Sequence, residues 1–379
     1  MSDATNKATF DIGLVGGGRW ARTVASTLLQ LKLEDRRILV CSPRHRDGWI
    51  SFKERLEEKD RHYVEIVSTV EQLLSKETVA SVLIVRSAKD HARTAISALE
   101  AGKDCFIEKP FALTLSEAEQ VVAAAKGRRC LVGLVFLFAE NLRLFADKTS
   151  CIDMLDHVDI VWTDPRAEQR GGERKRYDAG INVLVDVFPH VWSIIALLLD
   201  PFTLHDPEVR IDGGGRIVKL RLAADACNVT VHMERDAGCR TRLVQCRGRN
   251  GQSRIDFSRE PGVATVNGEA IDVSSTFTSP LQRELRFFLG MIEEIWPMHF
   301  AHVDQALQSV SLIDPVGAKI KEQQLAAIRT GSNERATPAD RLAAAFALRE
   351  LQLGSMGVAS NGDLSAQNEQ ENLTRTIDC

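Results

Sequence analysis

Residues 12–21 read Ile-Gly-Leu-Val-Gly-Gly-Gly-Arg-Trp-Ala and determine how the first half of the chain is interpreted. A short apolar strand runs into a glycine turn and then a helix, the geometry that directs backbone N–H groups at a pyrophosphate. Gly16 makes the turn, Gly18 lets the pyrophosphate approach, and Ala21 lets the helix pack on the strand. A plain tight turn is the alternative, but the strand before the loop and the helix after it favour nucleotide binding.

The residues after the second strand bear on the choice of cofactor. This strand ends about 20 residues after the glycine loop, where a ribose-reading residue belongs. The sequence there is Ser42-Pro43-Arg44, with no Asp or Glu. An arginine beside a hydroxyl suits a 2′-phosphate, which a carboxylate would repel, so NADP is favoured over NAD. Arg44 as a solvated loop residue is the alternative. Trp20 either lies along the nucleotide or stays on the helix surface.

The pattern of apolar runs predicts the fold class. Up to residue 135, short β-rich runs alternate with amphipathic helical stretches, as a doubly wound parallel sheet requires. We therefore expect a Rossmann dinucleotide-binding domain at 1–135, an α+β domain with a mostly antiparallel sheet at 136–330, and a helical extension with a polar tail at 331–379. The strands expected in the first domain are Asp11–Val15, Arg37–Cys41, Ser81–Val85, Asp104–Ile107 and Cys130–Leu134.

The second half has a different texture. A strongly apolar helix is expected at Val183–Leu199, and a polar loop at Asp164–Asp178 precedes it. Helices return at Leu281–Trp296, His302–Ile328 and Pro338–Leu353, and the tail from about Gly354 is expected to be disordered. A mixed stretch contains Val158–Trp162. The expected strands are Val209–Ile211, Arg216–Ala223, Cys227–Met233, Thr241–Cys246 and Ser253–Phe257.

Composition narrows the class of protein. A chain of 379 residues exceeds one usual hydrophobic core, which favours two domains. The net charge of −4 gives no hint of nucleic acid, and the apolar runs are too short to cross a bilayer, so we expect a cytoplasmic protein. Eight scattered cysteines without a CxxC pair indicate reduced core residues rather than disulfides or a metal site.

Two motifs carry chemistry. Lys109, in Glu108-Lys109-Pro110, follows a buried strand, where a cation can stabilise a developing alkoxide; a solvent-facing lysine is the alternative. Asp186 and His190 are four residues apart near the start of the apolar helix and would share one face. Titratable groups in such a run are costly without partners or a purpose, so they are either functional or a buried structural pair.

The order of these motifs resembles a known family. The glycine loop, Leu99–Lys103, Glu108–Thr114 and Asp186–His190 occur in the order found in the Gfo/Idh/MocA oxidoreductases. The resemblance implies that Lys109 lies beside the nicotinamide and the substrate. It implies that His190 exchanges a proton with the substrate oxygen, and that Asp186 orients it or binds a substrate hydroxyl. The family often pairs through its C-terminal sheet, so a homodimer or homotetramer is expected.

This sequence departs from the family pattern near the expected pocket. Phe188 replaces a usual glycine, and only Gly180 remains of a glycine-rich approach to the aspartate, so the pocket is expected to be reshaped. Arg86-Ser87-Ala88 replaces a frequent Thr-Pro-Asn, with His91 in its usual place. The Arg86 side chain has three alternative partners: the cofactor phosphates, a substrate carboxylate, or Asp90. The basic loop 166–176 is either solvated or closes over an anionic substrate.

The sequence thus predicts an NADP-dependent oxidoreductase acting on a carbonyl or imine of a polar small molecule, possible substrates being a sugar or natural-product intermediate. The alternatives are cofactor-assisted lyase or hydrolase chemistry without net redox, and a non-catalytic dinucleotide sensor. The candidate catalytic residues are Lys109, Asp186 and His190, and no metal ligands are expected. The candidate cofactor-binding residues are Gly16, Gly18, Arg19, Trp20, Ser42, Arg44, Arg86, His91, Glu108 and Lys109.

Overall fold

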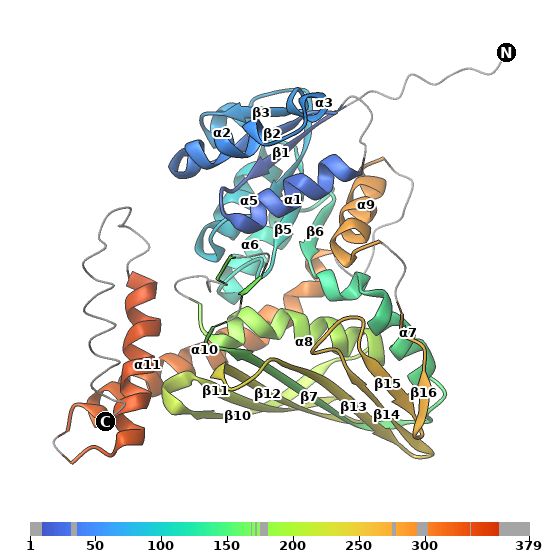
Figure 1. The fold of residues 1–379 in the computed structure, drawn as a ribbon, viewed down its shortest axis with the longest axis vertical. Helices are drawn as coiled ribbons and strands as arrows, with labels where there is room; N and C mark the ends of the chain where they lie inside the picture. Colours follow the sequence, from blue (N-terminus) through green and yellow to red (C-terminus); the bar gives the residue numbers. More distant parts are fainter. Residues whose placement is uncertain are drawn as a thin grey trace.

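A computed structural model gives the fold of the chain (Figure 1). No helix among the described residues is both long and apolar enough to span a membrane. The described residues are 10–31, 36–167, 169–170, 173–174, 181–274, 278–293, 302–333 and 335–355.

The N-terminal part is built on a six-stranded parallel sheet in the order β3-β2-β1-β4-β5-β6. The strand interiors are apolar and buried, as parallel strands covered by helices on both faces require. The predicted doubly wound sheet is confirmed, and the strand order reverses beside β1, the position where such sheets bind ligands. The strands are β1 (Asp11–Val15), β2 (Ile38–Cys41), β3 (Val64–Val67), β4 (Val79–Ile84), β5 (Asp104–Glu108) and β6 (Cys130–Gly133).

Helices connect these strands. The helix after the glycine turn, α1, spans Arg19–Gln30, and α6 begins after Thr114, whose hydroxyl accepts from the backbone N–H of Glu117. Helix α6 spans Leu115–Ala124, and the other helices are α2 (Arg46–Glu54), α3 (Glu58–Arg61), α4 (Val70–Leu74) and α5 (His91–Glu100). Two short 3₁₀ turns are η1 (Pro43–His45) and η2 (Ala88–Asp90).

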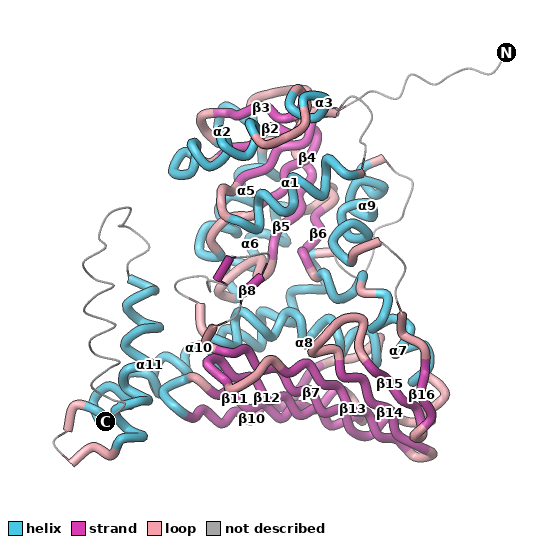
Figure 2. The backbone as a smooth tube through the Cα atoms, in the orientation of Figure 1, coloured by secondary structure: helices cyan, strands magenta, loops and turns pink. Residues whose placement is uncertain are grey.

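An eight-stranded mixed sheet forms the second part, and Figure 2 shows the strands gathered in two separate sheets. Its order is β10-β11-β12-β7-β13-β14-β15-β16, and every neighbouring pair is antiparallel except β12 with β7, so the predicted mostly antiparallel sheet is confirmed. The strands are β7 (Leu155–Pro165), β10 (Leu204–Asp212), β11 (Ile217–Ala224), β12 (Cys227–Ala237), β13 (Thr241–Gly248), β14 (Gly251–Asp256), β15 (Val263–Val266) and β16 (Glu269–Ile271).

Helix α8 (Val183–Leu199) lies between the two parts, packed on β11 and β12 and below the Rossmann-like sheet in Figure 1. It begins where the Asn182 side chain accepts a hydrogen bond from the Val185 N–H, and its bounds are those predicted. A 3₁₀ turn η3 (Val135–Phe138) and α7 (Glu140–Thr149) lead from the first sheet into the second. One face of the second sheet is therefore covered by α8.

The last helices tie the parts together. Helix α9 (Pro280–Ile292) packs on α1, and its Phe288 ring meets Phe106 of β5 at a centroid distance of 5.7 Å. Helix α10 (Val303–Gly331) contacts both α6 and α8, and α11 (Pro338–Ser355) packs on α10 and on η4 (Gly213–Gly215). Segments expected in the second domain thus also contact the first, and the division at 135 and 330 stays a prediction.

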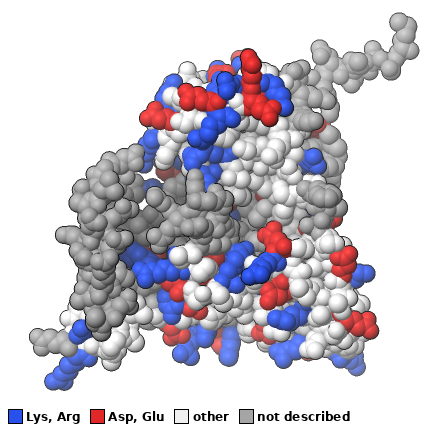
Figure 3. Space-filling view, viewed as in Figure 1, with Lys and Arg blue, Asp and Glu red and all other residues white. Residues whose placement is uncertain are grey.

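The face of the second sheet away from α8 is polar. Its exposed residues include Lys219, Arg221, Gln245, Arg247 and Arg254. Figure 3 shows acidic and basic side chains interspersed along this lower part of the molecule. The expected pairing of subunits through this sheet stays a prediction.

Some expectations lie outside the described residues or need correction. Strands β3, β15 and β16 were missed. Strand β7 occupies the mixed stretch around Val158–Trp162, which was not assigned as a strand, and ends at Pro165, inside the stretch expected to be loop. Two further two-residue strands, β8 (Gln169–Arg170) and β9 (Glu173–Arg174), lie in the same stretch. Helix α11 reaches Ser355, so the expected disordered tail, from about Gly354, falls almost wholly outside the described residues, as do Gly180 and part of the basic loop 166–176.

Candidate functional site

The glycine turn has the geometry of an anion-binding loop. A Cβ on Gly16 would lie 1.8 Å from the Val85 carbonyl oxygen, and one on Gly17 would lie 2.4 Å from Ser42 Oγ. A Cβ on Gly18 would meet open space, and Gly18 begins α1 with no side-chain cap. The first N–H groups of a twelve-residue helix are therefore directed at an open position, as a pyrophosphate requires.

Two side chains that the sequence reasoning missed hold this loop. The buried Trp49 of α2 donates its indole N–H to the Gly16 carbonyl at 2.8 Å. The Arg22 guanidinium donates to the Gly17 carbonyl at 2.8 Å. Nothing in the local sequence around Trp49 indicated this contact, because it joins residues 33 positions apart.

The segment after β2 fits a 2′-phosphate. Ser42 Oγ lies 3.3 Å from His45 Nδ1, and Arg44 is exposed on η1. Among the described residues, no hydrogen bond or ion pair engages the Arg44 guanidinium. Arg19 is likewise exposed at the start of α1. Gly17 lies next to Ser42 and His45, so the turn that carries Arg44 adjoins the glycine loop, and the residues present fit a dinucleotide that carries an extra phosphate.

Arg86 and His91 make local contacts. The Arg86 guanidinium donates to Thr94 Oγ1 at 3.0 Å and pairs with Asp90 at 3.1 Å, the third of the alternatives for this residue. The buried His91 ring lies between two carbonyl oxygens, with Nδ1 2.7 Å from that of Pro110 and Nε2 2.9 Å from that of Arg86. His91 therefore braces the turn that follows Lys109, and its role in cofactor binding stays a prediction.

Two buried carboxyl groups adjoin the end of β5. Burial raises the pKa of Glu108 to about 7, although Lys109 and a hydrogen bond from Trp20 act in the opposite direction. Glu284, which α9 contributes, is 1% exposed, and burial followed by the charge of Glu108 raises its pKa well above the ordinary value. Trp20 is 39% exposed as a residue but is tied to Glu108 by that bond. Sequence reasoning missed Glu284, whose signal is an acidic residue on the apolar face of a helix.

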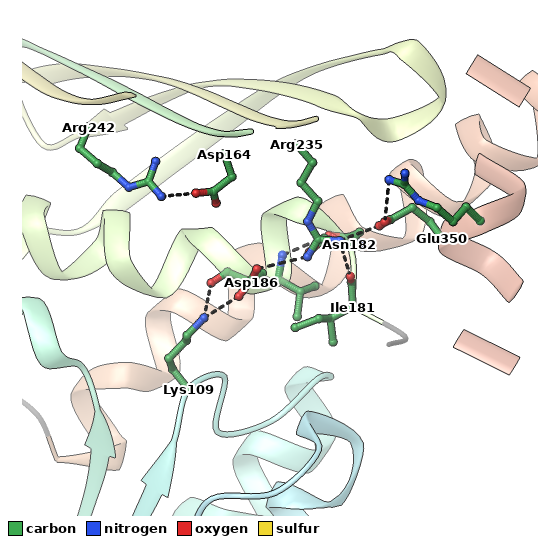
Figure 4. Close-up of polar contacts among 10 residues, drawn as sticks. Lys109, Asp164, Ile181, Asn182, Asp186, Arg235, Arg242 and Glu350 are labelled. Carbon is green, nitrogen blue, oxygen red and sulfur yellow. Dashed lines mark hydrogen bonds and ion pairs between the residues drawn. The ribbon is translucent and has the colours of Figure 1, made fainter. Parts of the chain in front are cut away.

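Lys109 and Asp186 meet, as Figure 4 shows. The Lys109 ammonium lies 2.6 Å from Asp186 Oδ1 and donates to the Asp186 backbone carbonyl at 2.8 Å. Their side chains are 14% and 20% exposed, so the pair is largely withdrawn from water. This contact joins the end of β5 to the first turn of α8 across 77 residues of sequence.

The other oxygen of Asp186 is held from the sheet. Arg235 of β12 is 1% exposed, and its guanidinium lies 3.2 Å from Asp186 Oδ2. Among the described residues, the side-chain partners of this carboxylate are thus Lys109 and Arg235, and not His190. The sequence did carry a signal for Arg235, because it continues the inward register of the buried Val229, Val231 and Met233.

His190 instead lies among aromatic rings. It stacks on Trp162 with centroids 5.3 Å apart and meets the Phe136 ring edge to face at 4.9 Å. The buried Arg242 of β13 places its guanidinium carbon 3.8 Å from the Trp162 centroid and pairs with Asp164. The two rings, with the arginine behind Trp162, fix the orientation of the imidazole. His190 lies on the same helix as Asp186, one turn later.

Phe188, which replaces a usual glycine, is fully buried in the core. No group of three or more His, Cys, Asp or Glu side chains suited to a metal ion occurs in the part of the chain that the structure describes. All described cysteines are free, and most are buried.

The comparison with protein families agrees with the predicted resemblance. Residues 10–136 match the Gfo/Idh/MocA model, described as an oxidoreductase family with an NAD-binding Rossmann fold. The resemblance is confirmed for residues 10–136, and the description of the matched family as oxidoreductases agrees with the predicted class. No curated protein matches the sequence.

Solved structures share the two-part fold. The 3-ketoreductase KijD10 from Actinomadura kijaniata, in complex with NADP and TDP-benzene, has a TM-score of 0.66 at 20% identity, over 82% of this chain and 97% of its own. The UDP-N-acetylglucosamine 3-dehydrogenase GnnA from Acidithiobacillus ferrooxidans has a TM-score of 0.64 at 17% identity, over 80% and 95%. An oxidoreductase from Thermotoga maritima reaches 0.67 at 15% identity, over 81% and 95%.

Proposed function

We propose that this chain, whose N-terminal part belongs to the Gfo/Idh/MocA oxidoreductases, uses NADP(H) to transfer a hydride to or from a carbonyl or imine carbon of a polar small molecule. The substrate class we propose is a sugar, carried by a nucleotide. Two similar structures support this class, because one was solved with NADP and a TDP ligand and the other is named for a UDP-sugar. The Lys109–Asp186 contact is the observation that carries the proposal, because it joins the nucleotide-binding part to α8.

The chain's own residues fit the cofactor. The open position at Gly18 and the first turn of α1 would hold the pyrophosphate, and Ser42 with Arg44 would hold the 2′-phosphate. When bound, the nicotinamide supplies the site that gives or takes the hydride. Trp20, just after the glycine loop, is linked by a hydrogen bond to Glu108, the residue before Lys109.

One N–H of Lys109 has no partner among the described residues and is left for a substrate. An ammonium group has three donors, and two are directed at the Oδ1 and carbonyl oxygens of Asp186. The third is available to a substrate oxygen, where the positive charge stabilises the alkoxide that develops as a carbonyl carbon is reduced. Asp186 fixes this orientation from one side.

The reduced oxygen also needs a proton. We assign this step to His190, which is half-buried and held by Trp162 and Phe136. In the reductive direction the carbon gains a hydride and the imidazolium gives its proton to the oxygen; in the oxidative direction neutral His190 accepts the hydroxyl proton.

The first experiment titrates the protein separately with NADPH and NADH and follows nicotinamide fluorescence. We expect tighter binding of NADPH, and we expect Arg44→Ala to weaken NADPH by about 1–3 kcal/mol while NADH changes little. Arg55→Ala is the matched control, since Arg55 is also an exposed arginine of this part. Equal losses for both cofactors would reject the role of Arg44, and binding of neither would refute the proposed function.

The second experiment tests the chemistry. TDP- and UDP-linked keto sugars are screened with NADPH, and the corresponding hydroxy sugars with NADP. Lys109→Met and His190→Asn should keep their NADPH affinity and lose turnover, the latter with a changed pH profile. Unchanged turnover in both variants would remove these residues from the mechanism.

A further inference from the structure

The C-terminal helix α11 reaches the candidate site through Arg235. One guanidinium nitrogen of Arg235 lies 3.2 Å from Asp186 Oδ2, and the other lies 2.7 Å from Glu350 Oε2. Figure 4 shows Lys109, Asp186, Arg235 and Glu350 in one chain of contacts that begins at the Rossmann-like sheet and ends on α11. Cationic and anionic groups alternate along it.

Arg235 also fixes the start of α8. Its guanidinium donates to the Ile181 carbonyl at 3.0 Å, and its second terminal nitrogen lies 3.5 Å from that of Asn182. Asn182 is the residue that caps α8, and its carbonyl accepts the first helical hydrogen bond from the Asp186 N–H. A displacement of Arg235 would therefore move both the charge and the backbone that hold Asp186.

The contact with α11 is a double one. Arg235 pairs with Glu350, and the next residue of β12, Asp236, pairs with Arg349 at 2.8 Å. Two successive residues of strand β12, one cationic and one anionic, thus pair with two successive residues of helix α11 that carry the complementary charges. The inner pair is deeper: the side chains of Arg235 and Glu350 are 1% and 9% exposed, against 30% for Arg349.

Among the described residues, the cations Lys109 and Arg235 are paired with two carboxylates, those of Asp186 and Glu350. A buried charge without adequate compensation is strongly unfavourable. Glu350 supplies the second negative charge. Burial raises its pKa while Arg235 and Arg349 act in the opposite direction, so the carboxylate's environment depends on these cations.

We propose that Glu350 is a positioning residue for the Lys109–Asp186 pair, acting through Arg235, so that helix α11 completes the site. The relevance to catalysis rests on the proposed function, but the positioning itself does not. Without the Glu350 charge, Arg235 draws more strongly on Asp186, the surroundings of Lys109 become more positive, and its ammonium form is disfavoured.

Competitive acetylation tests this without a substrate. The protein is treated with trace acetic anhydride over a range of pH, and the labelling of Lys109 is read by mass spectrometry. In Glu350→Gln we expect the pH midpoint of Lys109 labelling to fall, because the loss of a nearby negative charge disfavours the ammonium form. Glu350→Asp should shift it less, in the same direction. NADPH affinity should stay within twofold of the wild type.

Arg349→Gln is the matched control, because it breaks the outer pair and leaves Glu350 in place. A Lys109 midpoint that does not move in folded Glu350→Gln overturns the proposal, as does an equal shift in Arg349→Gln. If Glu350→Gln fails to fold, Glu350→Asp decides in the same way. A shift without any oxidoreductase activity would leave the positioning intact and sink the proposed function, whereas lost turnover without a shift would sink the positioning alone.

Discussion

Replacing Glu108 by Gln should make the protein increasingly stable relative to the wild type as the pH rises. In the folded protein the pKa of Glu108 is raised, mainly by burial, from 4.5 to about 7. The residue keeps some exposed surface, but its carboxyl group lies at depth next to Glu284. Between these two pH values the native state binds more protons than the unfolded state, so the free energy of unfolding falls as the pH rises.

The two pKa values set the magnitude. The stabilisation is fully present below pH 4.5 and is lost as the pH passes 7, and the difference corresponds to at most about 3 kcal/mol. Glutamine carries no charge and removes this dependence. The free energy of unfolding of Glu108→Gln minus that of the wild type should therefore rise by up to about 3 kcal/mol between pH 4.5 and 8. Glu284→Gln should change with the same sign, because the pKa of Glu284 is also raised by burial.

Urea unfolding followed by tryptophan fluorescence measures this difference at each pH. Subtracting the wild-type curve cancels the titrating groups that Glu108 does not influence. Glu100→Gln is the control, since Glu100 is an exposed glutamate on α5. A flat difference for Glu108→Gln would refute the argument that burial governs this carboxyl.

Three other predictions follow from contacts in the fold. Gly16→Ala should not yield a stable protein, because its Cβ would meet the Val85 carbonyl at 1.8 Å. Gly18→Ala should keep the wild-type urea midpoint of unfolding and bind NADPH at least about tenfold more weakly. A stable Gly16→Ala variant would contradict the first expectation. Trp49→Phe should lose about 1–3 kcal/mol by leaving the Gly16 carbonyl unpaired. Its control is Trp192→Phe, since the buried Trp192 N–H has no hydrogen-bond partner among the described residues, and equal losses would count against the contact. Iodoacetamide should label the exposed Cys151 and Cys239 in the native protein, but not Cys105 or Cys130, whose thiol pKa values burial raises; mass spectrometry that finds native Cys105 modified would contradict it.

The strands of the first sheet could be predicted because each is a short apolar run between polar segments. The exception is β3, Val-Glu-Ile-Val, which lies at the edge of the sheet and carries an acidic residue in four positions. Strand β16 lies at the edge of the second sheet with β15 beside it, and both were missed because they are short and bury few side chains. Helix α8 was predicted to its ends because its apolar run is long and Asn182 caps it.

The site was predictable residue by residue but not as an arrangement. Lys109 and Asp186 each stand out where the local pattern predicts apolar residues, yet their pairing, across 77 positions, exists only in the folded chain. The pairing of Asp186 with Lys109 likewise depends on where β5 meets α8. Glu350 gave no local signal, because a glutamate on a helix is ordinary until its partner is known.

Arg235 and Arg242 connect these observations. Each takes a place on β12 or β13 where the register points a side chain toward α8, and the preceding or following residues of that register are apolar and buried. Burying a guanidinium costs several kcal/mol unless it is paired, and apolar residues of similar size would satisfy the fold. Arg235 holds Asp186, and Arg242 lies on Trp162, which stacks on His190. Each of the two candidate side chains on α8 is therefore backed by one buried arginine from the sheet. Both guanidinium groups are paired with carboxylates, Arg235 with Asp186 and Glu350 and Arg242 with Asp164. Since packing alone would favour apolar residues at both positions, their presence is best explained by the orientation they impose on Asp186 and on the Trp162 ring that stacks on His190.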